Sequence, residues 1–352
     1  MGRFVARRIL YMFAVILVVS AITFGLMHAV PGGPFEREKP LPPEIIANLE
    51  KRYHLDEPLL MQYGRYLYEI FIPRIDSNRP GLSLENDFLI NIRLGESTWF
   101  HWMNFGPSYS SRSRTVNDIF RDNLPVSFLL GIMALTVAIL LGVPLGIIAA
   151  LKQNTIFDYF GMSVAIFGVS VPVIVLGPLL IWIFGVTLRW LPPTGWGSKP
   201  PYVMGVFPST MGWDYWKHAI MPAVALGLGS SAIIARLTRA SLLQVVREDY
   251  IRTARAKGLK ERLVLTRHAL KNSLIPVVTV LGPMFAALVT GTFVTEITFG
   301  IPGMGRYFVT SITNRDYPVI MGTILLYAVF LVVANLIVDL LYAFLDPRIR
   351  YE

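Results

Sequence analysis

The chain alternates long apolar runs with polar segments, and the apolar runs set its architecture. Six runs are present, at 9–30, 127–151, 159–186, 219–235, 274–294 and 319–345. A helix needs about 20 apolar residues to cross the hydrocarbon core of a bilayer. Each run is therefore long enough, or nearly so, to span a membrane, although the fourth is short and could instead be a buried or tilted segment. The pattern predicts an all-α polytopic membrane protein with six transmembrane helices.

The first run has two readings, because Arg3, Arg7 and Arg8 precede it as they would precede a secretory signal. The run is 22 residues long, which exceeds the roughly 7–15 apolar residues of a signal peptide. No A-x-A cleavage pattern stands before the turn-forming residues 31–33. We therefore expect a retained helix rather than a cleaved signal.

Composition agrees with a membrane protein. The 352 residues are 54% hydrophobic and only 16% charged, whereas a soluble domain carries about 25% charged residues. Cysteine is absent, which excludes disulfides and thiolate metal sites. The net charge of +9 would suit nucleic acid, but the position of the charges matters more than their sum.

The basic residues indicate the orientation of the chain. Six spans place both termini on one side, and that side carries 16 Lys and Arg residues. The other side carries 5 once the segment 31–126 is set aside, because long loops translocate regardless of their charge. We therefore expect cytoplasmic termini, with the basic excess marking the cytoplasmic face. This distribution weighs against nucleic acid as a partner.

Three units follow along the chain: a tail and first helix at 1–30, a large extracytoplasmic segment at 31–121, and a membrane-spanning core at 122–352. In the second unit, 41–71 has apolar residues at helical spacing, and 72–113 is expected to be irregular. A further outer loop at 191–213 is rich in Pro, Gly and aromatic residues. Its aromatic residues could anchor the chain at the membrane interface or contact a partner.

The loop 236–273 holds ten Lys and Arg residues between two apolar runs. Within it, Ile251, Ala254 and Gly258 or Leu259 share one narrow face of a predicted helix. Such a face would let the backbone of a soluble partner approach closely, and Gly258 would end the helix because it accepts left-handed backbone angles. The alternative is a solvated loop that only anchors the chain by its positive charge.

The motifs of this loop resemble those of ATP-binding-cassette importer permeases. The general signature places Glu-Ala-Ala, three residues and Gly before a later Ile-x-Leu-Pro, and here Ala254 and Gly258 take the second alanine and the glycine. The sequence departs from that signature, with Arg for Glu at 252, Thr for the first Ala at 253, and His268 and Lys271 at the later Ile and Pro. The departures agree with the peptide-importer branch, which reads R-T-A-R-A-K-G (252–258) followed by R-H-A-L (267–270).

Further segments resemble the same branch in the same order along most of the chain. They are NLPVS (123–127), AALKQNTIFDY (149–159), ARLTRASLLQVV (235–246), FGIPGMGRYF (299–308), NRDYP (314–318) and LIVDLLYAFLDPRIRY (336–351), with FGPSYSSRSRTVNDIF (105–120) before the second helix. The chain is similar to the B-type permease subunit of an oligopeptide or dipeptide importer. The part of the chain near 73–104 is longer than the usual link of the family.

The resemblance implies a passive transport subunit of a bacterial inner membrane. It implies a heterodimer with a C-type permease, two ATPase subunits that bind ATP and Mg²⁺, and an extracytoplasmic peptide-binding protein. The residues expected to couple this chain to the ATPases are Tyr250, Ile251, Arg252, Ala254, Arg255, Gly258 and Leu259. Related importers carry sugars or metal chelates, so the substrate stays open between these and peptides.

Other motifs argue against catalysis by this chain. The sequence has no G-x-x-x-x-G-K-[ST], H-E-x-x-H or G-x-S-x-G, so it lacks a phosphate-binding loop, a zinc-protease helix and a nucleophile elbow. The glycine-rich stretch 299–308 is expected to form a tight turn at an outer gate, using Gly300, Pro302, Gly303 and Gly305. We expect neither a catalytic nor a metal site, and no cofactor in this chain.

One acid, Asp339, lies inside an apolar run. An acid within a membrane span is a functional hypothesis by default, and a secondary transporter or channel would be the alternative function. Such carriers usually need partner charges within the membrane, and the apolar runs supply none. We therefore expect Asp339 to make a structural hydrogen bond near the interface.

Overall fold

The computed structural model describes residues 2–35, 42–77, 84, 86–95, 97–111, 113–203, 205–208, 212–290 and 292–345. Within these residues the chain is mostly helical. Residues 78–83 of the expected extracytoplasmic segment lie outside the described residues. The tail 346–352, which includes the end of the motif 336–351, also lies outside the described residues.

Of the helices in the described ranges, four are long and apolar enough to cross a membrane: α1 (Gly2–Ala29), α4 (Val116–Leu151), α7 (Trp213–Val245) and α14 (Tyr317–Leu345). Two further spans are possible if each of two bent helix pairs is counted as one. The first pair joins α5 (Ile156–Ser170) to α6 (Val173–Leu180) and the π-helical η1 (Ile181–Thr187). The second joins α9 (Glu261–Leu263), the π-helical η2 (Val264–Ala269) and α10 (Leu270–Ser273) to α11 (Ile275–Val289). The prediction of several apolar spans is confirmed.

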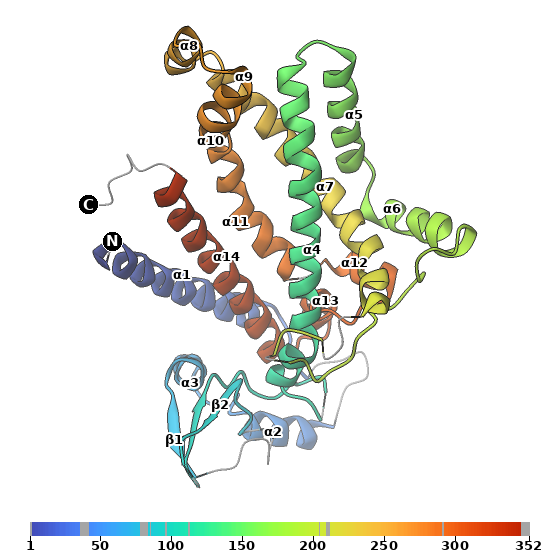
Figure 1. Cartoon of the computed structure of the whole chain (residues 1–352). Coiled ribbons are helices and arrows are strands. Elements are labelled where there is room, and N and C mark those ends of the chain that lie inside the picture. Colours follow the sequence, from blue (N-terminus) through green and yellow to red (C-terminus); the bar gives the residue numbers. More distant parts are fainter. Residues whose placement is uncertain are drawn as a thin grey trace.

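The third apolar run does not form one straight span. Between α5 and α6 the chain bends by 102°, and in Figure 1 α6 points away from the bundle. The bend falls at Val171, which has extended angles of φ −92° and ψ 112° and precedes Pro172. A proline disfavours helical angles in the residue before it. Hydropathy alone does not predict this break, because the apolar run continues on both sides of it.

The fourth apolar run is short, but it belongs to the long, unbroken helix α7. Charged residues such as Arg236 and Arg239 end the apolar run without ending the helix. α7 lies along α4 at the centre of the fold (Figure 1). A Cβ atom at Gly142 of α4 would lie 2.7 Å from the Ser231 carbonyl oxygen, and one at Gly227 would lie 2.7 Å from the Ala134 carbonyl oxygen. Glycines therefore set the close approach of these two helices, as small residues do between membrane helices.

The segment before α4 contains a small sheet. This corrects two expectations, that the chain is all-α and that residues 72–113 are irregular. Helices α2 (Pro43–Arg52) and α3 (Leu59–Phe71) precede the strands β1 (Arg74–Asp76), β2 (Ile90–Arg93) and β3 (Trp99–Trp102). The strands pair antiparallel in the order β1-β3-β2. Aromatic residues favour strands, but strands of three or four residues are too short to show an alternating pattern.

α4 begins before the expected boundary at 121, within the polar end of the 31–121 segment. Thr115 and Asp118 form a capping box, in which the Thr115 hydroxyl accepts from the Asp118 N–H and the Asp118 carboxylate accepts from the Thr115 N–H. A capping box satisfies two of the N–H groups that a helix start leaves free. The mixed polar and apolar segment 116–123 therefore extends the helix beyond its apolar run.

Three short helices complete the fold: α8 (Asp249–Ala256), α12 (Phe293–Phe299) and α13 (Gly305–Thr313). In Figure 1, α8 lies at one end of the bundle and the small sheet at the other, with α12 and α13 nearer the sheet.

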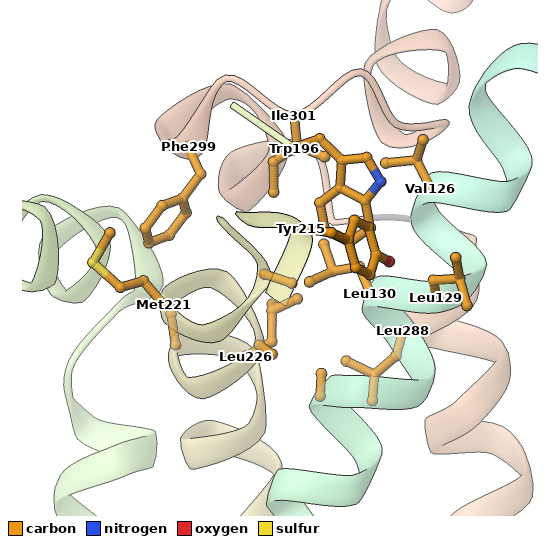
Figure 2. Close-up of a cluster of buried hydrophobic side chains, with 14 of the residues drawn as sticks. Val126, Leu129, Leu130, Trp196, Tyr215, Met221, Leu226, Leu288, Phe299 and Ile301 are labelled. Atoms are coloured by element: carbon orange, nitrogen blue, oxygen red, sulfur yellow. The ribbon is translucent and has the colours of Figure 1, made fainter. Parts of the chain in front are cut away.

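A buried apolar cluster joins α4, α7, α11 and the turn after α12 (Figure 2). Trp196, from the loop 191–213, packs edge-to-face on Tyr215 with ring centroids 5.4 Å apart and is only 3% exposed. This tryptophan is therefore neither an interface anchor nor a contact for a partner. Trp213, in the same loop, is exposed, and for it both readings stay open.

Candidate coupling and gate sites

α8 packs its apolar face onto its own chain. Ile251 is fully buried and Ala254 is 5% exposed, and both belong to a cluster that includes Leu242 of α7 and Val264 and Ala269 of η2. The sequence reading of this face as free for a soluble partner is therefore wrong for these two residues. The periodicity correctly identified a shared face, but it could not tell which neighbour covers that face.

The outward side of α8 and its following turn carry the exposed members of the predicted coupling set. Tyr250, Arg252 and Leu259 are exposed, and Tyr250 also accepts a hydrogen bond from the Asn272 side-chain amide at 2.9 Å. Gly258 has φ +75°, and a Cβ there would meet nothing within 4 Å. Gly258 therefore ends the helical turn through its left-handed backbone, as expected, without packing closely on anything in this chain.

An ion pair closes this turn. Two guanidinium nitrogens of Arg255 donate to the Glu261 carboxylate, at 3.1 and 2.7 Å. The pair ties α8 to the start of α9 and hence to the bent helix that continues into α11. Both side chains are exposed, and exposed pairs contribute only about 0–1 kcal/mol. Its main effect is to orient α8 relative to α9.

A second ion pair braces the bundle at the same end. Arg239 of α7 donates through Nε and Nη2 to the two carboxylate oxygens of Asp158 on α5, both at 2.7 Å. Asp158 also accepts from the Asn154 N–H at 3.0 Å, and its side chain is 4% exposed. Bidentate pairs of this kind fix relative orientation as well as distance. Sequence reasoning missed this pair, although both residues lie within the motifs 149–159 and 235–246.

The glycine-rich turn connects α12 to α13. Gly300 ends α12 with φ +63°, a left-handed angle that suits glycine. The preceding carbonyl, of Phe299, accepts from the Gly195 N–H at 2.7 Å, so the turn is tied to the loop that carries Trp196. Pro302 is exposed at the tip of the turn. The prediction of a tight turn at Gly300 is consistent with this geometry.

A buried glutamate, Glu296 of α12, organises the rest of this turn. The Ser127 hydroxyl on α4 donates to Glu296 Oε1 at 2.8 Å, and the Arg306 N–H donates to Oε2 at 3.3 Å. Ser127 Oγ in turn accepts from the Met304 N–H at 2.8 Å. Glu296 is 1% exposed, and burial raises its pKa to about 7, opposed by its hydrogen bonds and by Arg306.

The carboxylate explains two of the predicted gate glycines. A Cβ at Gly303 would lie 2.3 Å from Glu296 Oε1, and one at Gly305 would lie 3.0 Å from Oε2 and 2.7 Å from the Phe293 N atom. Neither glycine is needed for a positive φ. Their role is to leave space for the carboxylate. Glu296 could be suspected from sequence only as an acid that closely follows an apolar run.

A further buried acid holds the turn between α13 and α14. Asp316 accepts from the hydroxyls of Ser108 and Ser110 and from the N–H groups of Tyr109 and Ser110, the last two at 3.0 and 3.1 Å. The motifs 105–120 and 314–318, far apart in sequence, thus meet here. This contact fixes the 31–121 segment to the start of α14.

Asp339 has a charged partner on another helix. Arg8 of α1 lies 2.8 Å from the Asp339 carboxylate. The expectation that the acid lacks a charged partner is therefore wrong, because the partner comes from the basic residues at the start of α1 and not from an apolar run. The pair joins α1 to α14, which lie side by side (Figure 1), and so agrees with a structural role.

Comparison with known proteins places most of the chain in one family. A family model described as "Binding-protein-dependent transport system inner membrane component" matches residues 142–351. A second model, "Binding-prot-dependent transport system membrane comp, N-term", matches residues 1–82. The two models together reach both ends of the chain.

Named relatives match over almost their full length. A protein of Bacillus subtilis named dipeptide transport system permease protein DppB is 42% identical over 99% of this chain and 98% of its own. A protein of Salmonella typhimurium named oligopeptide transport system permease protein OppB is 39% identical over 100% of both chains. A solved structure titled as an inward-facing methionine ABC transporter MetNI aligns with a TM-score of 0.48 at 16% identity, covering 64% of this chain and 94% of its own.

The family descriptions and the relatives' names denote membrane subunits of bacterial transport systems, not enzymes. The apolar helices of the fold suit such a subunit. The chain belongs to the family of binding-protein-dependent transport system inner membrane components, and it is a membrane permease subunit of an ABC importer.

Proposed function

We propose that this chain forms half of the translocation pathway of an importer for dipeptides or oligopeptides. Separate ATPase subunits, which bind ATP and Mg²⁺, drive transport, and an extracytoplasmic binding protein delivers the peptide. A second, C-type permease completes the pathway as a heterodimer. The names of relatives 39–42% identical over the full chain support the peptide substrate.

The observation that carries the mechanism is the placement of α8. Its buried residues Ile251 and Ala254 fasten it to η2 and to the end of α7, and its exposed residues Tyr250 and Arg252 remain available to an ATPase. One face of α8 is packed on its own chain and the other face is exposed to the ATPase. A movement of the ATPase would therefore be transmitted through α8 to the elements that α8 packs against. ATPase closure would thereby move α7 and the bent helix α9–α11 as rigid bodies.

The turn between α12 and α13 is the proposed outer gate. Glu296 and Ser127 hold it against α4, and the Phe299 carbonyl ties it to the loop near Gly195. The turn therefore contacts two elements that would have to separate for a pathway to open between them. We assign Gly300, Pro302, Gly303 and Gly305 to this gate.

The proposed topology has six spans, with each bent pair crossing once. Both termini and the coupling loop 236–273 lie in the cytoplasm, and the 31–121 segment lies outside the inner membrane. The separation of α8 from the small sheet in Figure 1 supports this arrangement. Since the chain has no cysteine, the variants Lys51→Cys and Lys257→Cys should each react once, from opposite sides of intact cells. Labelling of both from outside would contradict the topology.

The function is tested by reconstitution with and without partners. The whole complex in proteoliposomes should take up a labelled dipeptide or oligopeptide only with ATP and the binding protein, whereas this chain alone should neither transport nor hydrolyse ATP. Transport by the chain alone would indicate a secondary transporter or channel. Uptake of a sugar or a metal chelate in place of peptides, by the same complex, would retain the importer but reject the peptide substrate.

A further inference from the structure

A cavity of about 310 Å³ lies away from the coupling and gate sites. It is lined by the last two turns of α1, including Phe24 and His28, and by the first two turns of α14, including Tyr317 and Met321. Its other side is formed by α2, α3 and the turn between them. Among the described residues, none of α8, α12 or α13 lines it. The proposed coupling and gating roles therefore leave the cavity unexplained.

The inner surface of the cavity is apolar and aromatic. Met27 and Met321 are buried in one cluster, with Phe24 and Tyr66 packed against it. On one side, Tyr109 lies against Tyr53 with ring centroids 4.6 Å apart. A concave, largely apolar site with a few polar groups is the usual form of a small-molecule site.

The rim of the cavity carries an excess of basic side chains. Arg65 donates to the Glu57 carboxylate at 2.6 Å, and His54 Nδ1 lies 3.2 Å from the same carboxylate oxygen. Arg52 is exposed, has no carboxylate partner within the described part of the chain, and lies over the Tyr53 ring at 5.9 Å. Glu69, which also lines the cavity, pairs through Oε1 with Arg74, whereas its Oε2 is buried without a hydrogen-bond partner among the residues that the structure describes. The rim therefore offers positive charge to an anionic group.

We propose that the cavity is a phospholipid site, with the phosphate of the headgroup at Arg52 and Arg65 and the glyceryl end over Phe24 and Met27. Position decides the ligand class, because α1 and α14 are candidate membrane spans and the cavity lies at their ends. Headgroups lie at this depth, where aromatic and basic side chains commonly meet the bilayer surface. Arginine binds phosphate oxygens through charge-assisted hydrogen bonds.

The test compares phospholipids with a lipid that lacks phosphate. The purified full chain in detergent is titrated with dioleoylphosphatidylglycerol, dioleoylphosphatidylcholine or dioleoylglycerol, and native mass spectrometry measures the retained lipid. Both phospholipids should be retained, and dioleoylglycerol should not. Arg52→Ala should weaken the first binding event by about tenfold, which corresponds to one charge-assisted hydrogen bond, and Arg52→Glu should weaken it further.

Lys51→Glu is the matched control, because Lys51 is the exposed neighbour of Arg52 and does not line the cavity. It should leave retention unchanged. Arg52 is also exposed, so its variants should keep the wild-type unfolding temperature, which is measured alongside. Equal retention of dioleoylglycerol, or wild-type phospholipid binding by Arg52→Glu, would overturn the proposal. So would Arg52-dependent binding of a short apolar peptide without Arg52-dependent binding of phospholipid.

Discussion

The Ser127 hydroxyl of α4 donates a hydrogen bond to the Glu296 carboxylate of α12 at 2.8 Å, across 169 positions of sequence. The same hydroxyl oxygen accepts from the Met304 N–H, so one side chain connects α4, α12 and the turn between α12 and α13. All of these atoms are buried, where an unpaired polar group is costly.

Ser127→Ala tests this connection. It would leave the Met304 N–H without its acceptor and Glu296 without one of its donors, which should lower the free energy of unfolding by about 1–3 kcal/mol. Thr136→Ala on the same helix is the control, since that exposed hydroxyl donates to the Ile132 carbonyl one turn earlier in its own helix. Thermal unfolding of both variants in detergent gives the comparison. Equal unfolding temperatures would show that the serine bridge contributes nothing.

Glu296 also predicts a pH dependence. Burial raises its pKa from 4.5 to about 7 in the folded chain, so the folded state binds this proton more tightly than the unfolded state. The stabilisation from this proton is full below about pH 4.5 and is lost as the pH rises towards 7. Above about pH 7 this group no longer changes the free energy of unfolding. Glu296→Gln, which cannot titrate, should flatten the fall in unfolding temperature over this window. A variant with the same pH profile as the wild type would contradict the assignment.

Gly303→Ala should disturb the proposed gate by steric conflict, because the new methyl group would overlap the Glu296 carboxylate. We expect reduced peptide uptake by the reconstituted complex and a lower unfolding temperature. Gly64→Ala is a suitable control, since it lies within α3 with nothing within 4 Å of the added atom and should stabilise the helix by about 0.5–1 kcal/mol. Normal uptake by Gly303→Ala would reject the gate assignment.

The coupling helix is tested by variants on its two faces. Ala254→Asp would place an unpaired charge in the buried contact with η2, costing about 3–5 kcal/mol, and Gly258→Val would impose a strained positive φ. Both should abolish uptake without preventing membrane insertion. Arg252→Ala, on the exposed face, should reduce copurification of the ATPase while leaving the unfolding temperature unchanged. Normal uptake by all three would mean that the loop is only a positively charged anchor.

Removing one partner of the Asp158–Arg239 pair should be more damaging than removing both. Arg239→Ala leaves a carboxylate that is 4% exposed without its counter-charge, but Arg239 itself is 27% exposed, so the loss should fall below the cost of breaking a fully buried pair, which is about 3–5 kcal/mol. The double variant Asp158→Ala with Arg239→Ala should recover part of that loss. A double-mutant cycle on unfolding temperature measures the coupling, and purely additive effects would rule it out.

Several features of the fold can be predicted from local sequence alone. The long apolar runs predicted the helices that became α1, α4 and α14 because helix formation and membrane burial depend mainly on continuous hydropathy. Gly258 was identified as a helix end because glycine tolerates a left-handed angle in almost any context. The order of short motifs indicated the family, and the family comparisons confirm it.

Other features depended on neighbours that are distant in sequence. The partner of Glu296 is on α4, that of Asp158 is on α7, and that of Asp339 is on α1, and no local pattern encodes such pairings. The same limit explains why the face of Ile251 and Ala254 was identified but assigned to the wrong neighbour. Sequence periodicity determines which residues share a face, whereas the packing of the whole chain decides what that face contacts and which buried charges find partners.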